Sequence, residues 1–303
     1  MEHISVLKDE AIDGLNIKSD GIYVDATLGF AGHSMEIHKR LKRGRLIAFD
    51  QDLVAIDHSK KIFKDCDNVT LVHSNFSKMK EKLEELGITK VDGILFDLGV
   101  SSPQIDDATR GFSFQKDAML DMRMDTTNPF SAENVVNDYS QEELTKIFYL
   151  YGEEKYAPSI AKSIIKSRPI NRTLELKEAI IRGVPYKYAV MHHPERKIFQ
   201  AIRIEVNKEL SVLESVLPDA IDLLNKEGRI VVITFHSLED RIAKQIFNKY
   251  SSINELVKGL PVIPDEYKPK IKLINKKPII PSMEEIERNT RSKSAKMRIV
   301  ERI

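Results

Sequence analysis

Acidic residues and glycines follow two short apolar runs near the start of the chain. The first run ends at Asp25 and is followed by Gly29 and Gly32. Glycines at such a bend let the backbone turn into a helix and approach a ligand closely. The second run ends at Asp50, 21 residues after Gly29, where a carboxylate can accept hydrogen bonds from both hydroxyls of a ribose. We expect a cofactor that contains a nucleoside, although a turn and a helix cap would explain each residue taken alone.

The spacing of the glycines distinguishes between two such cofactors. A dinucleotide site needs the pattern G-x-G-x-x-G, which brings a helix N-terminus onto the pyrophosphate, and the chain has only Gly29-x-x-Gly32. Asp25, just before the bend, would repel a pyrophosphate but suits the ammonium and sulfonium groups of S-adenosylmethionine. The pattern favours a methyltransferase, with a nicotinamide-dependent dehydrogenase as the alternative.

Two polar residues end apolar runs further along the chain, Asp97 and His236. An aspartate in this place can accept hydrogen bonds from the exocyclic amine of a cytosine. We therefore predict that the methyl donor and its acceptor meet at Asp97, with an aspartate that only holds the following turn as the alternative. For His236, a contact with the target nucleotide and simple packing are equally open. Ser237 after it fits a helix N-cap, with Asp240 three residues on as the acid of a capping box.

The segment after Asp97 contains aromatic and acidic residues whose roles are open. Arg110 and Phe112 offer guanidinium and aromatic faces on which an unstacked base could lie, whereas Phe114 is better explained as core. Three aspartates recur at four-residue spacing: Asp117, Asp121 and Asp125. Because no histidine lies near them, they indicate a solvated helix face rather than a metal site, and we predict no metal.

A parallel sheet would bring the strand-end residues together. Four apolar runs alternate with helix-compatible segments in the first hundred residues, and a fifth follows much later. We predict strands at 21–29, 45–52, 68–76, 91–99 and 228–236, with helices at 33–43, 53–64 and 77–86. This alternation predicts βαβ units with parallel strands, whose ligands bind beyond the carboxyl ends of the strands. Two β-compatible pieces in the tail, 271–275 and 297–303, could complete the sheet.

About 130 residues separate the fourth and fifth predicted strands, far more than a crossover loop contains. This stretch has apolar stripes with helical spacing. A single amphipathic pattern from Ile198 to Leu224 then leads into the fifth strand. We predict a discontinuous sheet domain, 1–104 with 201–303, and an inserted helical domain, 105–200.

The charge is unevenly distributed along the chain. The 303 residues are 42% hydrophobic and 31% charged, with a net charge of +1. Residues 92–143 carry eleven acidic and three basic side chains, residues 155–203 eleven basic and three acidic ones, and residues 268–277 five lysines. Such asymmetry is typical of separate surfaces for a cationic ligand and a polyanion, and solvated helix faces are the alternative.

Cysteine content and hydropathy bear on the compartment. The one cysteine, Cys66, forms no internal disulfide and leaves no room for a cysteine-based zinc site. No apolar run approaches the ~18 residues of a membrane helix, and the N-terminus lacks the pattern of a secretory signal. We expect a cytoplasmic protein with no membrane partner; nothing in the sequence predicts its oligomeric state.

Strings of residues along nearly the whole chain resemble those of the bacterial 16S rRNA cytosine N4-methyltransferase family, called RsmH or MraW. The strings are His3 to Leu7, Gly29 to Ser34, Asp97 to Gln104, Arg110 to Phe114, Leu120 to Asp125, Tyr151 to Glu154, Phe199 to Arg203, Phe235 to Arg241, and Arg291 to Ala295. The resemblance implies a class I S-adenosylmethionine-dependent methyltransferase fold, a Rossmann-like sheet with an inserted helical substrate domain. It also implies methylation of the exocyclic N4 of one cytidine in the decoding region of 16S rRNA, within the small ribosomal subunit.

Carried over residue by residue, the resemblance implies cofactor contacts from seven residues: Ala31, Gly32, His33, Asp50, Phe76, Asp97 and Gln104. Phe76 would lie against the adenine and is predicted from the resemblance alone. Four residues depart from the family's usual pattern: Ala31 for Gly, Met119 for Pro, Lys197 for Arg and Thr290 for Pro. We expect the first to affect the cofactor loop and the others the contacts with RNA.

The expected reaction is a direct, in-line displacement at the sulfonium methyl group, with Asp97 and His236 at the reaction centre. Positioning of the reactants and acceptors for the amine would supply most of the catalysis. The target base would have to be rotated out of its stack, and the basic stretches would hold phosphates. A non-catalytic RNA-binding protein with the same fold is the second alternative.

Overall fold

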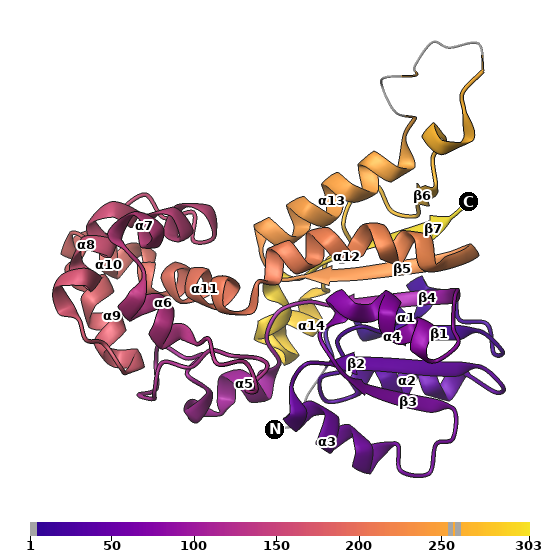
Figure 1. Ribbon diagram of the computed structural model, residues 1–303, viewed down its shortest axis with the longest axis horizontal. Helices are drawn as coiled ribbons and strands as arrows, with labels where there is room; N and C mark the ends of the chain where they lie inside the picture. The colour runs from indigo at the N-terminus through magenta and orange to yellow at the C-terminus, as the bar shows by residue number, and fades with distance from the viewer. Residues whose placement is uncertain (1–4, 254–256, 258–261) are drawn as a thin grey trace. The chain divides into compact units, whose positions relative to one another are not determined.

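The computed structural model describes residues 5–253, 257 and 262–303 (Figure 1). His3, in the first string that resembles the family, lies outside the described residues. The chain divides into two compact units, which we call the sheet unit (1–99 with 210–303) and the helical unit (100–209). From the sequence, the corresponding boundaries were expected at 104/105 and 200/201.

The sheet unit contains seven strands in the order β3-β2-β1-β4-β5-β7-β6. Their bounds are β1 Ile22–Asp25, β2 Arg45–Asp50, β3 Val69–His73, β4 Val91–Asp97, β5 Leu224–Thr234, β6 Ile271–Leu273 and β7 Lys296–Arg302. The first five pair in parallel, and β7 runs antiparallel to both of its neighbours. All seven predicted strands are thus confirmed, with shorter bounds in most cases, and the carboxyl ends of β1, β2 and β4 lie at one edge of the sheet.

Apolar residues alternate between the two faces of the sheet, as the period of two in a strand requires. Ile94 and Phe96 of β4 belong to one core, and Leu95 between them belongs to another. Helices α4 (Met79–Glu85), α12 (Glu209–Leu223) and α13 (Ser237–Ser251) pack into the first core. Helices α1 (Lys8–Leu15) and α2 (Gly32–Arg40) pack into the second. The sheet is therefore covered on both faces, which is why its strands read as continuous apolar runs.

Two further helices and three 3-10 turns complete the described part of the sheet unit. They are α3 (Leu53–Ile62), α14 (Met283–Arg288) and the 3-10 turns Phe76–Lys78, Asp265–Tyr267 and Thr290–Ser294. Helix α1 was not predicted from the sequence, since its eight residues are too few to show a clear periodicity.

The helical unit is built around one apolar core of its own. Its helices are α5 Ser102–Asp106, α6 Ala132–Asp138, α7 Gln141–Leu150, α8 Ala157–Ser167, α9 Thr173–Arg182, α10 Tyr186–His192 and α11 Pro194–Asn207, with a 3-10 turn at Ala108–Arg110. Within the part of the chain that the structure describes, none of the helices combines the length and apolar character that a bilayer crossing requires.

The long amphipathic pattern from Ile198 to Leu224 is two helices rather than one. Helix α11 ends at Asn207, and Lys208 adopts a left-handed backbone conformation with φ 53°. The side chain of Asn207 helps to end the helix by donating to the carbonyls of Arg203 and Met122. Apolar spacing continues across the break, so periodicity alone could not show it.

The aspartates at four-residue spacing do not form a helix face, because residues 111–131 are irregular. Asp117 pairs with Arg172 at 2.6 Å, and Asp121 pairs with Arg123 at 2.7 Å. Asp125 accepts hydrogen bonds from the backbone and hydroxyl of Thr127. The prediction of a solvated helix face is therefore wrong, and these carboxylates hold the loop together.

Candidate functional site

Three aspartates end neighbouring parallel strands of the sheet unit: Asp25 on β1, Asp50 on β2 and Asp97 on β4. Asp25 is buried and accepts hydrogen bonds from the hydroxyl of Ser34 at 2.7 Å and the backbone N–H of Thr27 at 3.1 Å. Its burial raises the pKa of Asp25 to about 6, against the effect of these two donors. No lysine or arginine among the described residues pairs with any of the three aspartates.

Asp50 joins two segments of backbone at the end of β2. One carboxylate oxygen accepts from the N–H of Gly29 at 2.8 Å, and the other accepts from the N–H of Asp52 at 2.8 Å. Burial raises its pKa to about 6. The helix cap that could have explained Asp50 is supplied by Asp52, which accepts from the N–H of Val54. Each oxygen of Asp50 keeps a further lone pair that can accept a hydroxyl donor.

Asp97 has one carboxylate oxygen in a buried position without a partner. Its Oδ1 is buried and makes no hydrogen bond among the described residues. Its Oδ2 lies 3.5 Å from Nδ1 of His33. Burial, followed by repulsion from the carboxylates of Asp25 and Glu239, raises the pKa of Asp97 well above its usual range. An unpaired buried acceptor is costly, so Asp97 is arranged for a donor or a cation that binds here.

His33 lies beside Asp97. Nε2 of His33 lies 3.1 Å from the carbonyl oxygen of Val6, which can only accept, so Nε2 carries a hydrogen. A neutral imidazole would then present the lone pair of Nδ1 to Oδ2 of Asp97. Nδ1 lies 3.5 Å from Oδ2, so a proton on either the imidazole or the carboxyl group would remove this repulsion.

The bend between β1 and α2 brings backbone close to this edge. Gly29 has φ +50°, and a Cβ there would meet nothing closer than 3.9 Å. At Gly32 a Cβ would lie 1.9 Å from Oγ of Ser5, so only glycine fits against the N-terminal segment. Ala31 caps α2 with φ 65°, a left-handed conformation that costs an alanine roughly 1–2 kcal/mol. The departure from glycine at this position is thus accommodated with strain.

Phe76 and Gln104, both predicted from the family resemblance, lie in different units. Phe76 follows β3 in the sheet unit, where it is half-buried and packs edge-to-face on Phe96 with 5.6 Å between ring centroids. Gln104 belongs to the helical unit. It is buried there, and its Oε1 accepts from the backbone N–H of Ser101 at 3.0 Å in a capping box of α5.

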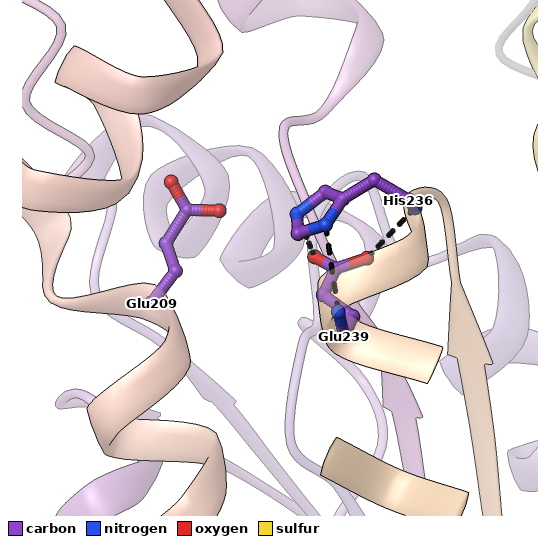
Figure 2. A group of neighbouring side chains, drawn as sticks. All are labelled: Glu209, His236 and Glu239. Atoms are coloured by element: carbon purple, nitrogen blue, oxygen red, sulfur yellow. Dashed lines mark hydrogen bonds and ion pairs between the residues drawn. The ribbon is translucent and has the colours of Figure 1, made fainter. Parts of the chain in front are cut away.

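His236 forms the N-cap of α13 with its side chain (Figure 2). Its Nδ1 accepts from the backbone N–H of Glu239 at 3.4 Å, and its Nε2 lies 3.1 Å from Oε1 of Glu239. The capping pair is therefore one residue earlier than predicted. Asp240, the predicted acid of that pair, binds Arg298 at 2.7 Å instead. Because Nδ1 accepts a hydrogen bond, the proton of a neutral His236 lies on Nε2.

Arg110 and Phe112, whose faces were predicted to stack on an unpaired base, mostly make contacts within the helical unit. The guanidinium of Arg110 donates to the carbonyls of Arg123 and Met124. Phe112 packs against the core of the helical unit, and Phe114 packs on Phe199 at 5.8 Å. Phe114 is core as predicted, whereas Arg110 stabilises the loop rather than presenting an open face.

The strand-end residues fit a ligand that carries positive charge and a ribose. Three carboxylates that pair with no lysine or arginine among the described residues would be stabilised by a cation. The left-handed bend at Gly29 leaves open space beside Asp50. A parallel sheet with antiparallel β7 between β5 and β6, and polar groups at the carboxyl ends of β1, β2 and β4, defines a class I S-adenosylmethionine-dependent methyltransferase.

Comparison with known proteins shows the family of this chain. The model of the MraW methylase family matches residues 1–303, so the chain belongs to that family. A solved chain from Clostridium thermocellum, assigned as an rRNA methylase, is 12% identical over 100% of both chains, with a TM-score of 0.47. A Streptococcus mutans methyltransferase solved with SAH is 10% identical over 99% of both chains, with a TM-score of 0.45.

Family membership confirms the resemblance seen in the sequence and, with it, the predicted cofactor. The protein is a methyltransferase, and its methyl donor is S-adenosylmethionine. The alternative of a nicotinamide-dependent dehydrogenase is wrong.

Proposed function

We propose that this methyltransferase acts on the exocyclic N4 of a cytidine in the decoding region of 16S rRNA, within the small ribosomal subunit. The observation that carries the proposal is Oδ1 of Asp97, a buried acceptor with no partner among the described residues. An exocyclic amine has two hydrogens to donate and suits such an acceptor. A hydroxyl group or a ring carbon that accepted the methyl group would offer fewer hydrogen-bond donors to Oδ1 of Asp97.

The residues of this chain have distinct tasks in the proposed reaction. S-adenosylmethionine supplies an electrophilic methyl group on a sulfonium. Gly29, Ala31, Gly32 and Phe76 would hold the donor, and Asp50 would accept from its ribose. Asp97 would hold the amine by one hydrogen and stabilise the positive charge that develops on its nitrogen.

His33 would position Asp97 from the side of Oδ2, 3.5 Å from its Nδ1, and leave Oδ1 for the amine. His236 would lie beside the reaction centre, because β4 and β5 are adjacent and Asp97 pairs with Ile233 in their register. The cytosine amine is a weak nucleophile, so positioning supplies more of the rate than proton abstraction.

The test is mass spectrometry of 16S rRNA from cells with and without the protein, followed by transfer of labelled methyl groups to small subunits from the deficient cells. We expect one methylated cytidine to be lost and then restored in vitro. Methylation restored on a different nucleotide, or on another atom of cytidine, would replace the proposed acceptor. Binding without transfer would support a non-catalytic role.

A further inference from the structure

Helix α10 of the helical unit exposes large side chains over most of its surface. Tyr186 is 80% exposed, Met191 65% and Val190 54%. Only Ala189 is buried among its seven residues. Clustered exposed apolar groups of this kind mark interaction sites rather than ordinary surface.

Three pairs of side chains, each four residues apart, run along the exposed part of α10. Tyr186 lies next to Val190, Lys187 next to Met191, and Tyr188 next to His192. We call these six residues the α10 face. Successive residues of an α-helix are turned by about 100°, so the three pairs spread around most of α10, with Lys187 and Met191 between the two pairs that contain aromatic rings.

The second of these aromatic pairs is already a stack. The rings of Tyr188 and His192 have centroids 4.4 Å apart and are tilted by 35°. Tyr156 packs against Tyr188 at 4.6 Å. The ammonium of Lys155 lies 4.7 Å from the ring of Tyr188. His192 is exposed at the end of this stack.

A buried carboxylate fixes the stack in place. Glu154 is fully buried and accepts from the hydroxyl of Tyr188 at 2.9 and 3.0 Å. It also accepts from the backbone N–H of Tyr156 and lies 3.5 Å from the ammonium of Lys197. Rings held in this way can receive a ligand with little loss of conformational entropy.

The charge around the α10 face is positive. Residues 182–197 contain four basic side chains and one acidic side chain, Glu195. Glu195 is buried and pairs with His193 at 3.1 Å. Lys187 and Arg196 are exposed. Aromatic rings interleaved with cations are the pattern that binds single-stranded nucleic acid.

We infer that the α10 face binds an unpaired segment of the RNA substrate, with one base stacked on Tyr186, another on His192, and phosphates held by Lys187 and Arg196. The inference rests on the proposed function, since it requires an RNA substrate. Stacking accepts any base, so the α10 face would strengthen RNA binding and position the strand. The residues of the sheet unit would select the target nucleotide.

The first test uses the absence of tryptophan from the chain. Tyr186→Trp introduces a single indole, whose fluorescence should be quenched in a saturable way by a single-stranded oligocytidylate. Tyr149→Trp is the matched control, because Tyr149 is a tyrosine of the same unit and is 48% exposed on α7. Equal quenching at both positions, or none at Tyr186, overturns the inference.

The second test measures affinity for the same oligocytidylate with full-length protein. Tyr186→Ala and His192→Ala should each weaken binding by about tenfold, in line with the loss of one stacked base. Tyr186→Phe should bind as the wild type does, because the ring is retained, and Tyr149→Ala should also leave binding unchanged. Cofactor affinity should stay constant in all four variants.

The two proposals fail in different ways. A wild-type protein that neither binds the oligocytidylate nor methylates small subunits would contradict the proposed function. A wild type that methylates small subunits, with Tyr186→Ala and His192→Ala binding RNA equally well, would contradict only the role of the α10 face. That second result would leave α10 available for a protein partner.

Discussion

The proposed chemistry requires the ionised form of Asp97, and because burial raises the pKa of this carboxyl group, the ionised form depends on the positive charge of the bound methyl donor. Asp97→Asn keeps the size of the side chain, and its amide can donate to Nδ1 of His33, so the local structure should persist. The amide cannot stabilise the positive charge that develops on the attacking amine. We expect single-turnover methylation to fall by roughly a hundredfold, the typical effect of losing one preorganised polar group.

RNA affinity of this variant should hardly change, because phosphate contacts dominate it. Asp57→Asn, on an exposed aspartate of α3, is the control for a general effect of charge. Methylation by Asp97→Asn at the wild-type rate would mean that a neutral acceptor is sufficient, and the reaction centre would have to be placed elsewhere.

Cofactor binding should depend on pH through Asp25 and Asp50. Burial raises both pKa values to about 6, so both carboxyls hold protons in the unliganded protein at about pH 5 and lose them by about pH 7. A cationic ligand pairs with the ionised forms. The contribution of each of these two groups to the affinity should therefore rise by about tenfold over this range and then level off. Calorimetry at several pH values, with proton release near pH 6 measured in two buffers, checks this expectation.

The stability of the unliganded protein should change in the opposite direction. An unfolded aspartate has a pKa of about 3.9, so the folded chain binds more protons than the unfolded chain between about pH 4 and pH 6. The contribution of Asp25 and Asp50 to the free energy of unfolding should fall as the pH rises through this window and stay constant above it, and the raised pKa of Asp97 extends the fall to higher pH. A contribution of Asp25 and Asp50, measured as the difference in free energy of unfolding between the wild type and their Asn variants, that rises over the same window would contradict the burial of these carboxylates.

The residues at strand ends could be predicted from the sequence, but their pairings could not. Asp25, Asp50 and Asp97 each end an apolar run, and parallel strands put such ends at one edge. The contact between His33 and Asp97 joins residues far apart in the sequence, and no periodicity reports it. The rings of Tyr156, Tyr188 and His192 were also missed, because their stacking depends on how α8 and α10 pack.

At the scale of elements, the capping of α13 allows the two roles of His236 to be separated. His236→Ala removes the acceptor for the N–H of Glu239 and should lower the free energy of unfolding by ~1 kcal/mol. His236→Asn restores a good capping side chain but not the ring. We expect thermal unfolding of His236→Asn to match that of the wild type while methylation remains impaired.

Comparison of the two variants, His236→Ala and His236→Asn, decides between the two explanations of His236 that the sequence left open. If His236→Asn recovers both stability and methylation, the histidine is a helix cap and nothing more. If His236→Asn keeps full stability but loses methylation, His236 contacts either the target nucleotide or the acidic residues around Asp97.

Strands were easier to predict than helix ends. The parallel strands are buried on both faces, so each appears as an apolar run between turn residues. The break between α11 and α12 depends on the left-handed Lys208 and on bonds from Asn207 to residues of a distant loop. Such breaks are set by tertiary contacts, and a continuous apolar stripe conceals them.

At the scale of the whole molecule, the two basic stretches predicted to bind RNA differ in the ion pairs that their lysines make. Lys162 and Lys166 are exposed on α8 with no ion pair among the described residues. Changing both to glutamine should weaken RNA binding and reduce the slope of log affinity against log salt by about two units, one for each lost phosphate contact. Salt-dependent titrations with labelled RNA measure both effects.

The lysines of the tail provide the control for that experiment. Lys268 pairs with Asp265 and Lys270 pairs with Asp222, so the same double change there should move the slope less. Arg168, also in the basic stretch, donates to the carbonyls of Val136 and Tyr139, and its loss should destabilise the helical unit. Equal slopes for both lysine pairs would leave the α8 lysines as a solvated face.

The insertion of the helical unit between β4 and β5 also sets an order of events during translation. β4 ends at Asp97, and its neighbour β5 begins at Leu224. The ribosome adds roughly 5–20 residues per second, so β4 lacks one partner strand for on the order of ten seconds. The core of the helical unit lies within one continuous stretch, so this unit can finish folding in that interval. Until β5 emerges, the nascent chain carries an open strand edge of apolar residues, and a ribosome that stalls there presents it to chaperones or to aggregation.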